Sequence, residues 1–207
     1  MTGSVSRRGF LGQITLASAA AALAHTPGFL RTGEWGPAAR AAAADVLHDT
    51  YNGLLAFVVP GRDEYSVQQG VATGDPGGVE AGSVDVLIAT IDESTPYVPD
   101  FATVIATILN GTALGINPNA AGPFVSPFAR LSNPEKAAVF QYLDGTDPYK
   151  VLAGVLPAFV AFFVYSDAGS FDPITRTLTG QPLGWTISNY EGVADGRDEF
   201  RGYLEGK

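Results

Sequence analysis

The sequence predicts an all-α protein: a single compact helical domain of about five helices, followed by an irregular C-terminal tail rich in aromatic residues. Three observations predict this fold class. Apolar residues recur at spacings of three and four along most of the chain, which is the period of an amphipathic helix. Proline, glycine and asparagine separate these segments at helix-length intervals. One segment also opens with the Ser-x-x-Glu pattern of a capped helix. We expect the helical domain over 44–168 and the tail over 169–207.

The first predicted helix covers 45–59. One face of it collects the apolar residues Leu47, Tyr51, Leu54, Leu55 and Val58. Pro60 and Gly61 follow at once, and this pair is typical of a helix end. The glycine-rich segment 70–78 lacks the lysine of a phosphate-binding loop and follows no predicted strand, so we expect an irregular loop there.

The second and third predicted helices are shorter. The second runs over about 78–93, with a stripe made of Val84, Leu87, Ile88 and Ile91. The third stripe comprises Phe101, Val104, Ile105, Ile108 and Leu109. We expect this helix to stop at Asn110 and Gly111 or soon after, because both residues favour helix ends.

The fourth predicted helix has the clearest start signal in the chain. Ser132 and Glu135 have the spacing of a capping box, and Pro134 falls early in the helix, where proline is tolerated. The helix then carries Ala138, Val139, Tyr142 and Leu143 and closes at Asp144 and Gly145.

The fifth segment, 149–165, is the most hydrophobic after the leader. Its apolar run from Val151 to Tyr165 is shorter than the roughly 20 residues that a membrane span requires. We therefore expect a buried central helix, kinked at Pro157, rather than a stable membrane span in the mature chain. A valine-rich run of this kind is also compatible with a strand.

The tail beyond Gly169 interleaves turn residues with aromatic ones and shows no helical stripe. Such a segment packs either on its own domain or on a partner. Aromatic residues dominate interface hot spots, so the candidate partner contacts are Trp185, Tyr190, Phe200 and Tyr203. The alternative, that they pin the tail to its own core, stays open.

The first residues resemble an export signal of the twin-arginine type. The paired Arg7 and Arg8 are followed by Phe10 and Leu11 and by an apolar stretch too short for a membrane span. Small residues at 39–43 provide cleavage patterns, so we expect 1–43 to be removed, with the cut between 41 and 44. The protein is then periplasmic, in the cell envelope or extracellular, and its first partner is the twin-arginine translocase. The alternative is an amphipathic first helix that contains two arginines.

Composition excludes several function classes for such a mature chain. Removal of 1–43 leaves eight basic and twenty acidic residues, a formal charge of −12, which opposes nucleic-acid binding. The chain has no cysteine, and only His48 remains of its two histidines. These residues provide no disulfide, iron–sulfur, haem-attachment or His/Cys zinc site, so we expect no cofactor and no metal.

Candidate catalytic residues are few. His48 lies on the polar side of the first predicted helix, and the chain has no G-x-S-x-G motif to supply a nucleophile, so a surface or capping role is favoured. The acidic clusters at 63–64, 92–93 and 195–199 do not have calcium-loop spacing. A pair of carboxylates close in space could still form a glycosidase-type site.

Several motifs resemble those of the small subunit of periplasmic flavin-dependent dehydrogenases, typified by gluconate 2-dehydrogenase subunit 3. A twin-arginine leader precedes a helix that ends in the segment 57–64, followed by the Pro-Gly-Gly-Val-Glu-Ala-Gly segment 76–82 and a helix with Asp85 and Ile88. The segment 128–136 resembles the start of the family's helix with leucine, serine, proline and glutamate, and Gly184 with Trp185 resembles its glycine-tryptophan pair. An uncharacterised exported family with the same layout fits these motifs as well.

The resemblance implies a subunit without a redox group and without catalytic residues. It would bind a large flavoprotein of the glucose-methanol-choline class, support its assembly and supply its export signal. Two alternatives remain: a free-standing exported binding or envelope protein, and a hydrolase that uses carboxylates, which requires a cleft holding at least two of them.

Overall fold

The computed structural model describes residues 37–95, 97–166, 170–172, 174–188 and 190. The described chain is mostly helical, with seven helices and one two-stranded sheet. The all-α prediction is therefore confirmed, with two short helices, α3 (Glu64–Gln68) and α8 (Leu183–Ile187), beyond the five predicted ones. The export-signal residues Arg7, Arg8, Phe10 and Leu11 lie outside the described residues, as do Phe200 and Tyr203.

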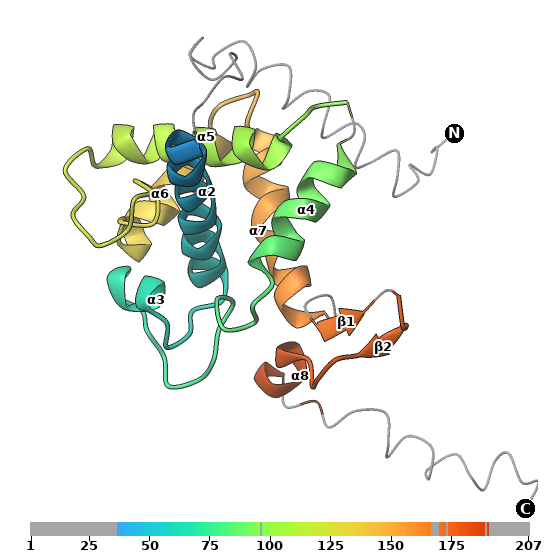
Figure 1. Cartoon of the computed structure of the whole chain (residues 1–207). Coiled ribbons are helices and arrows are strands. Elements are labelled where there is room, and N and C mark those ends of the chain that lie inside the picture. Colours follow the sequence, from blue (N-terminus) through green and yellow to red (C-terminus); the bar gives the residue numbers. More distant parts are fainter. Residues whose placement is uncertain (1–36, 96, 167–169, 173, 189, 191–207) are drawn as a thin grey trace, which may run out of the picture.

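The helices pack around one core (Figure 1). In chain order they are α2 (Pro37–Val58), α3 (Glu64–Gln68), α4 (Val84–Ser94), α5 (Phe101–Ile116), α6 (Asn133–Asp144) and α7 (Lys150–Tyr165). Helix α2 contacts α3, α4, α5 and α7, and α5 lies across one end of α2. Helix α6 packs on α5 and α7. The predicted central helix α7 is thus one wall of a core in which α2 has the most neighbours.

The chain after α7 forms a small projection. Strands β1 (Phe171–Asp172) and β2 (Thr177–Leu178) pair antiparallel, with Phe171 opposite Leu178. Helix α8 (Leu183–Ile187) follows and packs against the C-terminal end of α7, away from α5 (Figure 1). The tail was predicted to be irregular, but this part contains a hairpin and a helical turn. Both elements are too short to produce a periodic apolar pattern, which is why the sequence did not indicate them.

The predicted apolar faces of α2, α4 and α5 pack on the core, but only some of their residues are buried, and Leu47, Val84 and Val104, for example, are half-buried. In α2, Tyr51, Leu54 and Leu55 are fully buried, and the Tyr51 hydroxyl donates to the Ala102 carbonyl of α5 at 3.0 Å. Burial raises the pKa of Tyr51 well above its ordinary value, with a smaller contribution from the charge of Asp92. A neutral phenol therefore joins α2 to α5 inside the core.

Three helix boundaries differ from the prediction. Helix α2 begins at Pro37, so the expected cleavage site lies in its first turns. Helix α4 begins at Val84 rather than near 78, because 79–82 forms turns and Gly82 has a φ of +64°. Helix α5 continues through Asn110 and Gly111 to Ile116. Asn110 does not end it because its side chain is bonded to other elements rather than to the local backbone.

The bounds of α6 and α7 follow the prediction closely, but the prediction that α7 is buried is wrong for one of its faces, where Val151, Phe162 and Tyr165 are exposed. The capping box of Ser132 and Glu135 is present, and α6 ends at Asp144. Helix α7 continues through Pro157, and whether the proline kinks it stays a prediction. Of the helices in the described ranges, none is long and apolar enough to cross a membrane.

Candidate functional site

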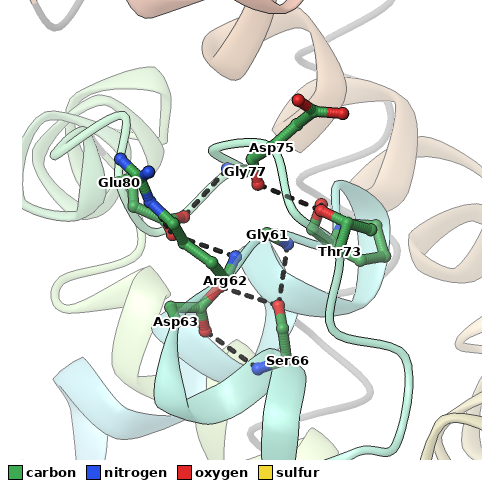
Figure 2. Close-up of polar contacts among 9 residues, drawn as sticks. Gly61, Arg62, Asp63, Ser66, Thr73, Asp75, Gly77 and Glu80 are labelled. Atoms are coloured by element: carbon green, nitrogen blue, oxygen red, sulfur yellow. Dashed lines mark hydrogen bonds and ion pairs between the residues drawn. The ribbon is translucent and has the colours of Figure 1, made fainter.

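Two sequence motifs meet in one loop junction that follows the C-terminal end of α2, and Figure 2 shows its polar contacts. We call it the glycine junction; it consists of residues 61–66 and 73–80. Gly61 and Gly77 lie so close that a Cβ atom on either would overlap the backbone of the other. The Thr73 N–H donates to the Gly61 carbonyl at 2.8 Å, and the Gly78 N–H donates to the Val59 carbonyl at 2.8 Å. The contact explains why glycine occupies both positions.

Two carboxylates hold the glycine junction together (Figure 2). Glu80 accepts the Gly77 N–H at 2.9 Å and the Arg62 N–H at 3.0 Å. Asp63 caps α3 by accepting the Ser66 N–H at 2.9 Å, and its other oxygen accepts the Ser66 hydroxyl at 2.7 Å. Both carboxylates are thus bonded to neighbouring backbone, which is the arrangement of loop-stabilising residues.

A buried lysine lies between α2, α3 and α6. Lys136 of α6 is fully buried, and its Nζ donates to the Gly53 carbonyl at 3.0 Å and to Gln69 Oε1 at 2.8 Å. Neither partner carries a charge. The Phe128 ring centroid lies 5.4 Å from Nζ, within the range of a cation–π contact.

Gln69 completes this buried polar centre. Its Nε2 donates to the Ala56 carbonyl of α2 at 2.6 Å, and its backbone carbonyl accepts the Asn133 N–H at the start of α6 at 2.9 Å. One residue therefore links α2, the end of α3 and α6. Burial lowers the pKa of Lys136 to about 7, and the more distant charge of Asp63 partly opposes the shift.

A second polar cluster fixes the long loop between α5 and α6. Asn110 donates to Thr50 Oγ1 at 2.9 Å and accepts from the Ser126 hydroxyl at 2.7 Å and from the Phe128 N–H at 3.0 Å. Asp49 accepts the Val125 N–H and, at 2.7 Å, the Tyr65 hydroxyl. The Tyr65 pKa is raised by burial and by this bond to Asp49. Asp49 and Asn110 thus position the backbone of the loop, because each accepts a backbone N–H from it.

The predicted chemistry-bearing residues lie apart from these clusters. His48 is exposed on α2, and its Nε2 lies 3.3 Å from Asp85 of α4, consistent with the predicted surface role. Within the part of the chain that the structure describes, no group of three or more His, Cys, Asp or Glu side chains could hold a metal ion.

Two carboxyl groups have lowered pKa values. The Glu135 pKa is lowered chiefly by the hydrogen bond from the Ser132 hydroxyl. Asp172 has its pKa lowered, chiefly by the Ile174 N–H. A general acid needs the opposite shift.

Two of the four candidate partner contacts lie in the projection after α7. The Trp185 and Tyr190 rings pack edge to face, with centroids 5.2 Å apart. Trp185 is half-buried and Tyr190 is 45% exposed. The neighbouring hairpin exposes further apolar side chains, namely Phe171, Ile174 and Leu178, and Ile174 is 91% exposed. We call these five residues the hairpin patch.

Sequence reasoning missed the buried polar centre. It assigned Ala138, Val139, Tyr142 and Leu143 to α6, but Tyr142 is 56% exposed, and the buried face is formed by Lys136, Val139 and Leu143. The spacing of Lys136 from Val139 and Leu143, three and seven residues, was the available signal. It was overlooked because lysine is rarely fully buried.

Comparison of the chain with protein-family models, with curated proteins and with solved structures finds no match.

Proposed function

We propose that this protein is a non-catalytic accessory subunit that accompanies an exported flavin-dependent dehydrogenase through the twin-arginine pathway and supports its assembly. The observation that carries the proposal is the hairpin patch, which exposes apolar and aromatic side chains on a projection of the domain. Exposed apolar patches on soluble domains mark interaction sites. Aromatic residues at such sites carry much of the binding energy.

Two sequence features support the same function. The paired Arg7 and Arg8 and the apolar stretch after them resemble an export signal that is used by proteins folded before transport. The segments 57–64 and 76–82, which resemble motifs of the dehydrogenase small subunit, meet in the glycine junction. A partner that lacks its own leader would travel with this chain.

The decisive experiment is co-expression with a flavoprotein large subunit of the glucose-methanol-choline class encoded by a neighbouring gene. We expect the two chains to copurify, and we expect Ile174→Asp to weaken the complex because it places a charge in the hairpin patch. Tyr97→Asp is the matched control, since Tyr97 is 88% exposed on the connection between α4 and α5. Equal loss of binding in both variants, or in neither, contradicts the assignment of the patch.

Export gives an independent test. Changing Arg7 and Arg8 to lysine should stop export of the flavoprotein as well as of this chain. If the flavoprotein is exported normally, the carrier role is wrong, and a free-standing exported binding or envelope protein becomes the better interpretation.

A further inference from the structure

Helix α7 has no charged residue after Lys150, yet one of its faces is exposed. Helices α2 and α6 cover its buried side, α8 packs on its C-terminal end, and the buried residues are Leu152, Leu156, Val160, Phe163 and Val164. The other side carries a continuous row at spacings of three, four, four and three, which we call the α7 stripe: Val151, Gly154, Ala158, Phe162 and Tyr165. A helix that is apolar on all sides is normally buried on all sides. The stripe therefore has the character of an interface.

The residues of the α7 stripe have large exposed fractions. Val151 is 42% exposed, Phe162 66% and Tyr165 48%, and Gly154 and Ala158 are exposed as well. The small residues lie between the large ones, so the stripe has a low centre and high ends. An added Cβ at Gly154 would meet no atom within 4 Å, which means that the space above this residue is open.

The order of large and small residues is self-complementary. Gly154 and Phe162 lie four residues on either side of Ala158, and Val151 and Tyr165 lie seven residues on either side. If a second α7 crosses this one antiparallel with the two Ala158 residues facing, Phe162 of each copy falls opposite Gly154 of the other. Tyr165 then falls opposite Val151. Facing large and small side chains interdigitate.

We propose that two copies of this chain associate through their α7 stripes, antiparallel, about a two-fold axis at Ala158. Such an isologous contact uses the same surface on both copies, and it is available only to a surface that complements itself. The open space at Gly154 receives the Phe162 ring of the second copy. At Tyr165 the stripe borders α8, whose Gly184 packs on the Tyr165 backbone, but the proposed contact does not depend on the proposed function.

The size of the stripe sets the expected strength of the association. Five residues on each side are few beside the roughly 20–30 of a standard interface, so we expect the association to be weak and transient. The dimer is then concentration-dependent, and sedimentation velocity can follow it directly.

Residue swaps test which stripe residues face each other. They are made in the full chain, which is produced in cells and purified after any processing there. Gly154→Phe puts a ring against the partner's Phe162 and should abolish the dimer. The double variant Gly154→Phe/Phe162→Ala restores a large residue opposite a small one and should recover it. Gly111→Phe is the matched control, because Gly111 is an exposed helical glycine of α5 with open space around it. Circular dichroism verifies that each variant is folded.

A cross-link gives the second readout. The chain has no cysteine, so Ala158→Cys introduces a single thiol on the proposed axis, where facing helices bring Cα atoms within disulfide reach. We expect a disulfide-linked dimer on oxidation, and none for Gly115→Cys on α5. A monomer at all concentrations, or a dimer that Gly154→Phe leaves intact, overturns the proposal. A monomer in which the Ala158→Cys thiol is shielded from thiol reagents also overturns the proposal. That result would indicate that another part of the same chain covers the stripe.

Discussion

The buried ammonium of Lys136 makes a quantitative prediction about stability and pH. The folded-state pKa is about 7, compared with the ordinary value of 10.5, because burial disfavours the charged form. Between these two values the unfolded chain holds a proton that the folded chain has released. Stability therefore rises with pH across this window, and below pH 7 the full cost of burying the charge is present.

The size of the rise follows from the two pKa values. Between pH 7 and pH 9.5, the Lys136 contribution to the free energy of unfolding should increase by about 3 kcal/mol. The range stops at 9.5 because Tyr51 and Tyr65 have raised pKa values in the folded state. Above their ordinary pKa the unfolded chain loses protons that the folded chain keeps, so their contribution to stability falls as pH rises.

Urea unfolding followed by circular dichroism at several pH values measures this rise. Lys136→Met should remove it, while also leaving Gln69 Oε1 without its donor, at a cost of roughly 1–3 kcal/mol. Lys150→Met, at an exposed lysine of α7, is the control and should keep the rise. A Lys136→Met protein whose stability climbs as steeply with pH as that of the parent would refute the reasoning.

Two further substitutions test the local interpretations. Gly61→Ala should destabilise the fold by roughly 1–3 kcal/mol because its Cβ overlaps the Gly77 backbone, whereas Gly74→Ala, with open space around it, should be nearly neutral in the same urea titration. Ser132→Ala should cost about 1 kcal/mol by removing one side of the capping box, and it should raise the Glu135 pKa toward its ordinary value, measurable by NMR titration. In the parent, the lowered Glu135 pKa contributes folding stability that is lost as pH falls below the ordinary carboxyl pKa. The variant has a smaller shift, so it should lose less stability over the same pH range. Unchanged stability in both Gly61→Ala and Ser132→Ala would contradict the roles assigned to these two sites.

Much of the helical pattern was predictable because it depends on local periodicity. The faces of α2, α4 and α5 and the capping box of α6 were all assigned from spacing and punctuation, and the structure has them. Helix ends were harder to assign. Asn110 carries an end signal that its bonds to Thr50 and Ser126 override, and these partners lie 60 and 16 residues away in the chain.

The residues of the candidate sites could also be predicted in part, but their contacts in space could not. Trp185 and Tyr190 could be named from composition, but their edge-to-face contact and the hairpin beside them could not, since the hairpin strands are two residues long. The glycine junction was visible only as two separate glycine motifs. Their meeting depends on the path of the chain between them, which no local pattern encodes.

The sequence by itself determined that this protein is helical, where most helices lie, and which charges and ligand types it has available. These properties follow from side-chain chemistry and from the helical period, which act over a few residues. Only the tertiary structure decided that Lys136 is buried against Gly53 and Gln69, and that one face of the apolar helix α7 is exposed. Burial is a property of the whole packing arrangement, because a side chain is covered only by elements that the chain brings from elsewhere.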